Sequence, residues 1–593
     1  MLFRSPAIDR IMRKKPTLLS VLILSLFPSV FQFVSADPDS EPPGHDPDKG
    51  KPVPEFYAFL VPGDYPIPGI GQPFIYQPLI LSAVAAAPFS VAVIITDEEG
   101  RRADVGGHFA FTWSKKNHLD PENPPVELDL PKGKGAHYKF QHGLLIFDDL
   151  HYDECGLIQL TGEAHLQIPA VQGTKKVETT PLSVLLHPWK FLLNATCPIV
   201  PVQQAIEAQP TYSAGAPFDL TIYAVNARSE VTRNYPYDDE GSFVGKEIQV
   251  QTQIVVPQGS PYGRLCFLDG TAVAKISADR FTNGICTLNG IAFSDAGIFN
   301  VTVMDSNYFG VPIAGSLEWL GRFVPHHFEM GVDLPPMNRS PGNGYTYSGE
   351  PFSATVTVRA MNALPVPAVT CNYHGELARV GGQTLRIEAA EVSKAIGTVS
   401  APTVQPGFSN GVTVEVLSGI QFAFRAIREP KDILFVSSFE DLDHVAGSVA
   451  TNAVSFRCGK IRFRDRYGVE GDYLRIASDI DWYSSDGWRL NEDENHLVLA
   501  PGDLRIQVQS GSGTVQAAGE QQFFFGGRVR GGQDPLRVLS ESVTETLSVE
   551  VDLAPSSRLK FLESVPARWT IDSPRSIEPS GRVREKVLYE REG

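Results

Sequence analysis

The sequence predicts an all-β fold, in which tandem Ig-like β-sandwich modules are followed by a C-terminal β-rich domain. Three observations support this prediction: a strand pattern that recurs at a nearly constant interval, turn signals between short alternating strands, and the lack of a convincing amphipathic helix. The 593 residues include 46 Pro and 52 Gly, which favours short strands joined by tight turns. A chain of this length corresponds to about three to five domains of ordinary size.

The repeat is centred on a Pro-Phe pair that begins a strand. The pairs start at Pro88, Pro217 and Pro351, at intervals of 129 and 134 residues. Proline suits the start of a strand because a ladder donor is dispensable there. In the third copy alternate residues are apolar, and this period of two predicts a half-buried strand of an antiparallel sheet. The residues predicted to face one way are Phe352, Ala354, Val356, Val358 and Ala360.

Two further patterns extend the repeat. The second and third copies continue in step to Val231–Tyr235 (Val-Thr-Arg-Asn-Tyr) and Val369–Tyr373 (Val-Thr-Cys-Asn-Tyr). The first two copies end alike, with a strand, a tight glycine turn and a strand in 143–160 and in 290–301. Such a repeat, built from short strands, predicts serial β-sandwiches. We place the three modules at residues 55–195, 196–322 and 323–455, and the C-terminal β-rich domain at 456–593.

The N-terminal residues predict export. A basic region is followed by the apolar run Leu18–Val34 and by the small-residue cleavage site Val34-Ser35-Ala36, so residues 1–36 are predicted to be a secretory signal peptide. A membrane-anchoring signal is the alternative, because the apolar run is close to the length that spans a bilayer. Residues 37–54 are predicted to be a flexible acidic leader. No later stretch is apolar enough for a membrane span, and the expected location is the periplasm, the outer surface or a pilus.

Charge excludes one class of partner. Without residues 1–36 the chain keeps 46 Lys and Arg against 67 Asp and Glu, a net charge of −21. Such a surface repels phosphate backbones and anionic lipids, so nucleic-acid binding is not expected. Pilus proteins or other envelope proteins, and surface glycans, are the expected partners.

All six cysteines follow the predicted signal peptide, and an even count in an exported chain permits disulfides. Cys266 and Cys286 flank two strand-like runs, so they are predicted to form a disulfide across a hairpin. The alternative is that all six are buried free thiols. No Cys-x-x-Cys pair occurs, and we assign no zinc or other metal site.

An aromatic cluster is the candidate ligand-binding site. Trp482, Tyr483 and Trp488 flank a hairpin turn in the C-terminal domain. Together they are candidates for an aromatic platform that binds a sugar ring, because each has an apolar body and a polar tip. The alternative is that at least two of the three belong to the core of a small β domain.

No motif predicts an enzyme or a cofactor. Gly407–Gly411 matches the Gly-x-Ser-x-Gly pattern, but the β-rich run after it favours a turn over a nucleophile elbow. His326 and His327 favour packing between modules over metal binding, because no third ligand lies at a suitable spacing. The acidic clusters at 46–48, 238–240 and 492–494 favour solvated turns, with calcium between modules as the alternative.

Four segments resemble a known family. They are Gly321–Phe328 (Gly-Arg-Phe-Val-Pro-His-His-Phe), Phe456–Phe463, Trp488–Asp493 and Val587–Glu592. In this order they resemble the MSHA biogenesis protein MshQ family, large exported proteins associated with a type IV pilus. The resemblance covers roughly residues 200–593, with weaker support over 53–200. The chain departs from the family at Cys458, where Tyr is usual, and near Asn495-His496, where a Cys is usual.

The resemblance transfers no catalytic residue and implies association with a pilus or with the cell surface. We therefore expect a non-enzymatic exported protein of MSHA-like pilus biogenesis or surface adhesion, without a cofactor. One alternative is a carbohydrate-binding or carbohydrate-active surface protein that uses the C-terminal domain. The other is a periplasmic pilus assembly factor. Glycan binding by the C-terminal domain separates the first alternative, and cell fractionation separates the second.

Overall fold

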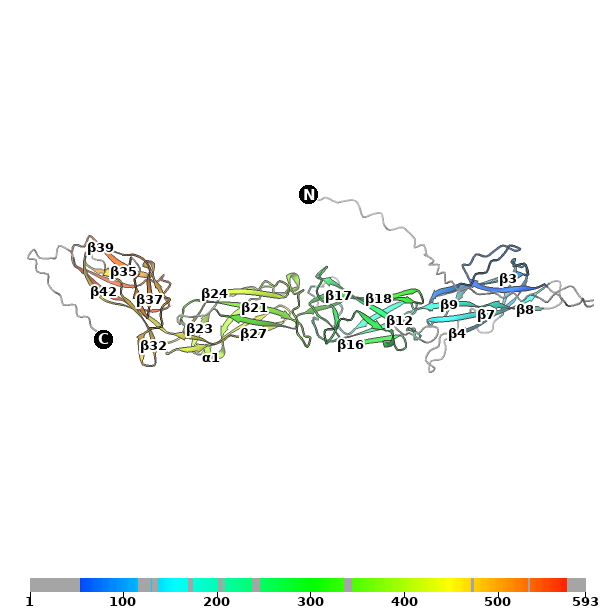
Figure 1. Ribbon diagram of the computed structural model, residues 1–593, viewed down its shortest axis with the longest axis horizontal. Coiled ribbons are helices and arrows are strands. Elements are labelled where there is room, and N and C mark those ends of the chain that lie inside the picture. Colours follow the sequence, from blue (N-terminus) through cyan, green and yellow to red (C-terminus); the bar gives the residue numbers. More distant parts are fainter. Residues whose placement is uncertain are drawn as a thin grey trace, which may run out of the picture. The chain divides into compact units, whose positions relative to one another are not determined.

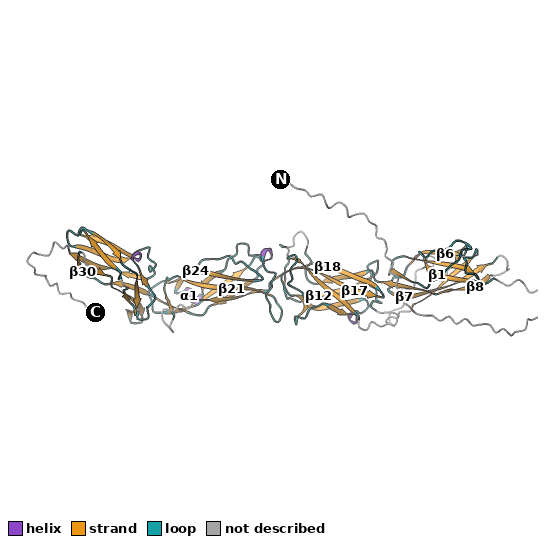
Figure 2. Ribbon diagram, turned by 45° about the horizontal axis from the view of Figure 1, so that its top comes forward, coloured by secondary structure: helices purple, strands orange, loops and turns teal. Residues whose placement is uncertain are grey.

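The structure is a computed structural model that describes residues 54–115, 130, 137–168, 174–200, 206–207, 209–236, 246–334, 344–470, 474–531 and 534–572. The predicted signal peptide and, apart from Pro54, the acidic leader lie outside the described residues, as do the acidic cluster 238–240 and residues 573–593. Nearly every described element is a strand, and the helical segments are as short as α1 (Glu391–Lys394) (Figure 2). No helix in the described ranges is long and apolar enough to cross a membrane.

Module 1 lies at the blue and cyan end of the chain (Figure 1). Its strands are β1 (Phe56–Pro62), β2 (Ile80–Val84), β3 (Phe89–Asp97), β4 (Gly106–Lys115), β5 (Tyr138–Phe140), β6 (Leu144–Leu150), β7 (Gly156–Gln167), β8 (Thr174–Thr180) and β9 (Leu182–His187). They pair in the order β2-β9-β7-β8-β1-β3-β6, and β4 joins β5 to β7. Because β8 pairs both with β7 and with β1, it connects the two halves of the sandwich.

Module 2 has two separate sheets, β10-β12-β16-β14 and β11-β18-β17-β13-β15. Its strands are β10 (Lys190–Ala195), β11 (Tyr212–Ser213), β12 (Phe218–Val225), β13 (Glu247–Val256), β14 (Leu265–Phe267), β15 (Lys275–Ser277), β16 (Ile285–Phe293), β17 (Gly297–Tyr308) and β18 (Val311–Val324). Their inner faces enclose one apolar cluster that includes Phe218, Ile222 and Phe323.

Module 3 has sheets ordered β19-β21-β24-β23, β20-β28-β25 and β22-β26-β27. Its strands are β19 (His327–Asp333), β20 (Tyr345–Tyr347), β21 (Phe352–Met361), β22 (Arg386–Ala389), β23 (Gly397–Ser400), β24 (Val412–Phe424), β25 (Lys431–Ile433), β26 (Phe435–Glu440), β27 (Ala446–Ala450) and β28 (Val454–Arg457). The predicted alternation is confirmed in β21, where Ala354, Val356, Val358 and Ala360 are buried.

The C-terminal unit has a large sheet, β34-β37-β38-β32-β29-β41 with β33 beside β32, and the smaller sheets β30-β42-β40-β35 and β31-β39-β36. Its strands are β29 (Gly459–Phe463), β30 (Arg466–Val469), β31 (Leu474–Arg475), β32 (Ser478–Ser484), β33 (Gly487–Leu490), β34 (Val498–Leu499), β35 (Leu504–Ser510), β36 (Thr514–Ala518), β37 (Gln522–Phe525), β38 (Arg528–Arg530), β39 (Arg537–Glu541), β40 (Leu547–Leu553), β41 (Glu563–Val565) and β42 (Ala567–Asp572). Trp569 is fully buried in its core.

Two features recur in all three modules. A short early strand pairs in parallel with a late one, as β2 with β9, β11 with β18, and β20 with β28. A two-residue turn with positive φ at both residues precedes β6, β16 and β24. The turns are His142-Gly143, Asn283-Gly284 and Asn410-Gly411, and glycine is required because a Cβ at Gly284 would lie 2.2 Å from the carbonyl oxygen of Thr232.

The strand pairing corrects three predicted boundaries. Phe323 and Val324, predicted to open module 3, belong to β18 and pair within module 2. Lys190–Ala195, predicted to close module 1, is β10 and pairs with β12 of module 2. Phe456 and Arg457, predicted to open the C-terminal domain, belong to β28 and pair within module 3. The junctions therefore fall near Pro188, Pro325 and Cys458, because each strand follows its hydrogen-bonding partners and not the nearest change in composition.

Candidate functional site

The first distinctive site is junction 1, where module 1 contacts module 2 through a buried carboxylate. Glu154 lies between β6 and β7, and one of its oxygens accepts the backbone N–H groups of Cys155 at 2.9 Å and Asn234 at 3.0 Å. The other oxygen accepts the N–H of Arg233 at 2.9 Å. The amide of Asn234 donates in return to the carbonyl oxygen of Cys155 at 2.7 Å. The Val-Thr-x-Asn-Tyr segment of module 2 is thereby bonded to the end of module 1.

Junction 2, between modules 2 and 3, has the same arrangement. One oxygen of Asp295 accepts the N–H groups of Ala296 at 2.7 Å and Asn372 at 2.9 Å, and the other accepts that of Cys371 at 3.0 Å. The amide of Asn372 donates to the carbonyl oxygen of Ala296 at 3.0 Å. The two repeated sequence patterns, the acidic glycine turn and Val-Thr-x-Asn-Tyr, thus meet across each junction.

A second asparagine supports each junction. The amide of Asn226 donates to the carbonyl oxygen of Asp153 at 3.0 Å, and that of Asn362 donates to Ser294 at 2.9 Å. The residue after each of these asparagines also bonds the preceding module. The N–H of Ala227 donates to the carbonyl oxygen of Ala85, and that of Ala363 donates to the carbonyl oxygen of Ala214. Neighbouring modules therefore share several buried hydrogen bonds that most often involve backbone groups.

Burial sets the protonation of these carboxyl groups. Desolvation raises the pKa of Asp295 to about 6, although three backbone N–H donors oppose the shift. The pKa of Glu154 is raised for the same reason.

Module 1 has Val105 at the position equivalent to Asn234 in module 2. The two positions are equivalent because each lies two residues after a residue, Ala103 or Thr232, whose N–H forms the same strand hydrogen bond in its module. The asparagine occurs only in modules 2 and 3, where it bonds the module before it.

Junction 2 also contains a buried ion pair. Arg322 of β18 donates to both oxygens of Asp443, which lies between β26 and β27, and neither side chain is exposed to solvent. The guanidinium is thereby held in module 3, although its backbone belongs to module 2. Leu185 and Asn307 occupy the positions at junction 1 that match Arg322 and Asp443. Junction 1 therefore lacks this ion pair.

Junction 3, between module 3 and the C-terminal unit, is built from side chains. The hydroxyl groups of Tyr345 and Tyr347 in β20 donate to one oxygen of Glu494, at 3.2 and 2.8 Å. The amide of Asn491 donates to both hydroxyl groups, at 2.8 and 2.6 Å. Arg457 bonds Asn491 and its charge lies 3.9 Å from the ring centre of Tyr345.

This arrangement corrects the prediction for the acidic cluster 492–494. A solvated turn was predicted, but Glu494 is fully buried and Asp493 pairs with Arg457 at 2.9 Å. The carboxylate is buried because two tyrosines from a strand about 150 residues earlier supply its hydrogen-bond donors. Glu492 and Asp493 are exposed, so the prediction is wrong only for Glu494.

The structure brings together two of the three predicted platform residues. Tyr483 of β32 pairs across the strands with Trp488 of β33, and their ring centres are 5.5 Å apart in an edge-to-face arrangement. Trp482 points to the opposite face of the sheet, where the guanidinium of Arg457 lies 4.7 Å from its ring centre. The prediction of one platform is wrong for Trp482, because successive residues of a strand face opposite ways. Tyr483 and Trp488 remain candidates.

The predicted disulfide between Cys266 and Cys286 is not formed, and all six cysteines are free. Cys266 in β14 lies opposite Ala292 of β16, six residues beyond Cys286 on that strand. At about 3.4 Å per residue this places the two cysteines roughly 20 Å apart, far beyond the Cα separation that a disulfide allows. Burial raises the pKa of the Cys286 thiol to about 11.

The other sequence candidates take part in turns and packing. Ser409 precedes the Asn410-Gly411 turn into β24, so the Gly-x-Ser-x-Gly segment is a turn, as predicted. His326 and His327 lie between modules 2 and 3 with ring nitrogens 3.1 Å apart. Within the described ranges no group of three or more His, Cys, Asp or Glu side chains is arranged to hold a metal ion.

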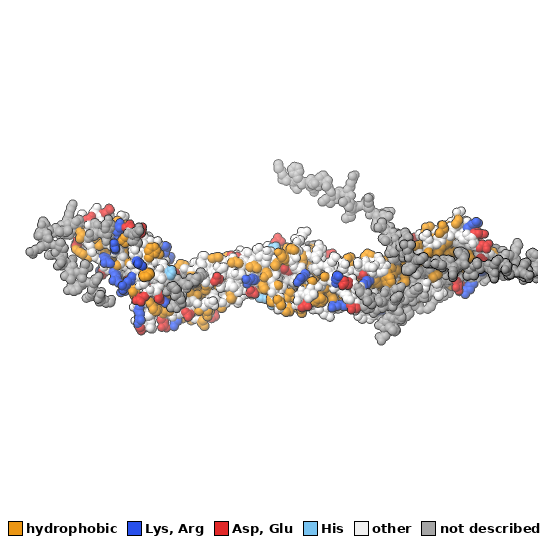
Figure 3. Space-filling view, viewed as in Figure 1, with side chains coloured by type: hydrophobic (Ala, Val, Ile, Leu, Met, Phe, Trp, Pro, Cys, Tyr) orange, Lys and Arg blue, Asp and Glu red, His pale blue; other side chains and the backbone are white. Residues whose placement is uncertain are grey.

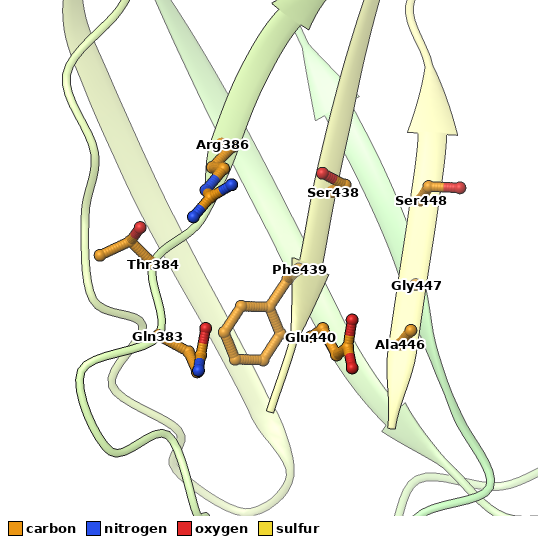
Figure 4. A pocket seen from close by; sticks show the side chains of 9 residues that line it. All are labelled: Gln383, Thr384, Arg386, Ser438, Phe439, Glu440, Ala446, Gly447 and Ser448. Atoms are coloured by element: carbon orange, nitrogen blue, oxygen red, sulfur yellow. The ribbon is translucent and has the colours of Figure 1, made fainter. Parts of the chain in front are cut away.

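A shallow groove of about 550 Å³ lies on module 3. Figure 4 shows that its lining comes from the segment before β22 and from β22, β26 and β27. The lining residues are Gln383, Thr384, Arg386, Ser438, Phe439, Glu440, Ala446, Gly447 and Ser448. Glu440 and His444 form an exposed pair at 2.9 Å beside it. The groove is the water-facing surface of a sheet, since Arg386, Ser438 and Ser448 are cross-strand neighbours.

Several solved structures of tandem β domains resemble the chain at low identity. A tetra-tandem repeat in the extending region of a large adhesion protein is 10% identical, with 83% of this chain and 97% of that chain covered and a TM-score of 0.28. Protocadherin gamma B2 extracellular cadherin domains 3–6 are 10% identical, with 85% and 99% covered and a TM-score of 0.19. Titin domains A168–A170 are 12% identical, with 68% and 99% covered and a TM-score of 0.18.

None of the curated proteins matches the chain. Residues 295–453, less than half of the chain, match the family model described as DUF6701, third domain. The matched segment begins at the carboxylate of junction 2 and ends within module 3, so it contains Asn372 and Asp443.

Proposed function

We propose that the chain is a non-enzymatic, exported envelope protein whose tandem modules act as a spacer in MSHA-like pilus biogenesis or surface adhesion. The observation that carries the proposal is the repeated junction. Glu154 and Asp295 are bonded to equivalent N–H groups of the next module. A spacer needs neighbouring modules to keep a fixed relation, and buried hydrogen bonds of this kind oppose bending because opening them leaves polar groups unpaired.

Further support comes from the sequence. The predicted signal peptide favours export, and four ordered segments resemble the MshQ family. The chemistry of the described surface favours recognition over catalysis, since the groove of module 3 is open and Ser409 belongs to a turn. The periplasmic assembly factor remains the rival within this class, because it requires the same export and the same modules.

Gene deletion with complementation tests the proposal. Loss of the gene is expected to reduce piliation or adherence, and the wild-type chain is expected to restore it. A chain with Glu154→Ala and Asp295→Ala, which loosens both carboxylate junctions, is expected to restore it only in part. The matched control is Asp269→Ala, which removes an exposed carboxylate from a turn of module 2.

Two results decide the outcome. Unchanged piliation and unchanged adherence in the deletion strain would exclude the proposed role. Fractionation then separates the alternatives, because an adhesion protein is expected on sheared pili or the outer surface. A soluble periplasmic pool with none on sheared pili would favour the assembly factor.

A further inference from the structure

The outer face of the large sheet in the C-terminal unit combines cations with aromatic rings. The inner face carries Ile461, Ile480 and Phe524, which are buried in the core. Strand alternation therefore turns the neighbouring residues outward. We call this surface the outer face; it comprises Lys460, Arg462 and Arg464 at β29, Asp479, Asp481 and Tyr483 of β32, Trp488 of β33, Phe523 and Phe525 of β37, Arg528 and Arg530 of β38, and Glu563 of β41.

The charge of the outer face is opposite to that of the chain. It carries five cations against three carboxylates, whereas the whole chain has a net charge of −17. Figure 3 shows Lys and Arg side chains gathered on the C-terminal unit, with hydrophobic side chains among them. An excess of cations on one surface raises the local concentration of anionic ligands there.

The arginines at β29 are held in place by buried carboxylates. Arg464 donates two hydrogen bonds to Asp479, at 3.0 and 2.8 Å, and Arg462 lies 3.4 Å from Asp481. Both aspartates are about nine-tenths buried or more. Burial raises the pKa of Asp481, while Arg462 opposes that shift. The guanidinium groups, whose side chains are about half exposed, are thus held in place before any ligand arrives, which lowers the entropic cost of binding.

The arginines of β38 are available for a ligand. Arg528 and Arg530 are exposed, and neither forms an ion pair with another described residue. The guanidinium of Arg530 lies 5.0 Å from the ring centre of Phe525, a residue that is 61% exposed. Phe523 is 50% exposed on the same strand. An exposed pair of phenylalanines on a β-strand is costly in water, which favours a surface that a partner covers.

The same pairing of a cation with a ring recurs across the sheet. The ammonium of Lys460 lies 3.9 Å from the ring centre of Trp488, which packs against Tyr483. From β37 to β29 the outer face spans three steps between strands, about 14 Å. This width exceeds one sugar ring, so successive residues of a polymer can contact successive rings and cations.

We propose that the outer face binds an anionic polysaccharide, whose sugar rings stack on the aromatic side chains while its acidic groups pair with the arginines. Sugar rings present apolar C–H faces that fit aromatic side chains, and guanidinium groups bind planar carboxylates through two hydrogen bonds. A nucleic acid has the same sign of charge and rings that can stack, so it is a comparator in the test. The proposal goes beyond the spacer role and does not depend on it.

Binding of defined polymers to the full chain tests the proposal. The probes are polygalacturonate and dextran sulfate as anionic polysaccharides, and dextran, a DNA oligonucleotide and poly-glutamate as comparators. We expect binding to at least one anionic polysaccharide and none to dextran. The double variant Arg528→Gln/Arg530→Gln is expected to weaken binding roughly tenfold or more. Phe525→Ala and Trp488→Ala are expected to weaken it without changing the net charge.

A matched control separates the outer face from general charge. Arg568→Gln removes an exposed arginine of β42, in a different sheet of the same unit, and is expected to leave binding unchanged. Thermal unfolding of each variant shows whether it is folded. Absence of binding to both anionic polysaccharides overturns the proposal, as does an equal loss with Arg568→Gln. Equally tight binding of DNA or poly-glutamate overturns the assignment to a polysaccharide.

Discussion

Junctions 1 and 2 join modules through backbone groups, whereas junction 3 joins module 3 to the C-terminal unit through side chains. At junction 2, Asp295 accepts three backbone N–H groups. At junction 3, Glu494 accepts the hydroxyl groups of Tyr345 and Tyr347. A backbone N–H donor does not depend on its own side chain, since those of Arg233 and Cys371 donate equally well at equivalent positions. A side-chain network requires each specific residue, because each hydroxyl or amide is one of its bonds.

This difference explains why the first kind of junction recurs and the second does not. A module that contains an acidic glycine turn can be followed by any module that contains Val-Thr-x-Asn-Tyr. Module 3 has Phe424 at the position equivalent to Asp295 of module 2. The equivalence follows from the backbone hydrogen bond of Gly349 to Phe422, which matches that of Gly215 to Phe293 two residues before Asp295. The C-terminal unit therefore needs another connection. The experiments below measure local opening by hydrogen exchange, since the whole chain is not expected to unfold in one step.

The largest effect is expected from breaking the buried ion pair of junction 2. Arg322→Leu leaves buried Asp443 with only the guanidinium of Arg379, 3.9 Å away, which destabilises the contact by about 3–4 kcal/mol. The N–H groups of Asp443 and Val445, which donate to Asp441, are expected to exchange much faster. The measurement is hydrogen exchange of the β26–β27 connection in the full chain.

The double variant Arg322→Leu/Asp443→Asn is the control for this result. It introduces the residue types that junction 1 has at Leu185 and Asn307. Because no charge is then left buried alone, the double variant is expected to recover much of the stability that the single variant loses. An equal loss in both variants would contradict this account of junction 2.

The next effect is a dependence of junction 2 on pH. The pKa of Asp295 is raised from 3.8 to about 6 in the folded chain. Because the folded value is the higher one, protonation favours the folded junction, whose stability is greatest below pH 4 and falls as the pH rises through 6. The whole change corresponds to about 3 kcal/mol.

Exchange of the Cys371 and Asn372 amides between pH 4 and 7, corrected for intrinsic rates, measures this dependence. Asp295→Asn removes the titrating group, so its opening free energy is expected to be constant over the same range. A constant value in the wild-type chain would show that Asp295 does not titrate as its burial requires. Junction 1 is expected to change in the same direction, because the pKa of Glu154 is raised as well.

A smaller effect is expected at junction 3. Tyr347→Phe keeps the ring in the core of the C-terminal unit but removes a hydroxyl that bonds Glu494 and Asn491. We expect a loss of about 2 kcal/mol, measured as a lower unfolding temperature of the C-terminal unit by calorimetry. Tyr223→Phe, at a partly buried tyrosine in β12, is the control. Equal shifts in the two variants would remove any special role for the Tyr347 hydroxyl.

The smallest effect is expected from a variant that makes junction 2 more similar to junction 1. The hydroxyl of Ser260 is bonded to the side-chain oxygen of Asn372, whereas the corresponding oxygen of Asn234 is buried without a partner among the described residues. Ser260→Ala is expected to cost about 1 kcal/mol in the opening of the Asn372 amide. Exchange at junction 1 provides the internal reference and is expected to stay the same.

The sequence predicted the modules because their signal is local. Alternation in 352–360 and the glycine turns depend on neighbouring residues, so they survive without knowledge of the fold. The junctions depend on residues about 80 apart, such as Glu154 and Asn234, and neither residue alone indicates a contact. The signal that could have found them was the shared occurrence of an acidic glycine turn in one module and Val-Thr-x-Asn-Tyr in the next.

The candidate site was predicted only in part, for a different reason. Trp482 and Tyr483 are adjacent in a strand, so a period of two already places them on opposite faces. Phe523, Phe525 and Arg528 complete the outer face, but they join Trp488 only through the order of strands in the sheet. Strand order depends on the whole domain and has no local sequence signal.

The six reduced cysteines have a consequence for how the chain matures. For a protein proposed to fold in an oxidising compartment, free thiols are vulnerable until the core closes over them. Cys155 and Cys266 are then fully buried, and burial raises the pKa of Cys197 to about 12, which leaves little of the reactive thiolate at neutral pH. Protection of the five buried thiols therefore comes from completed folding, whereas Cys371 stays partly exposed. Each module has to fold faster than oxidants or neighbouring thiols can trap it.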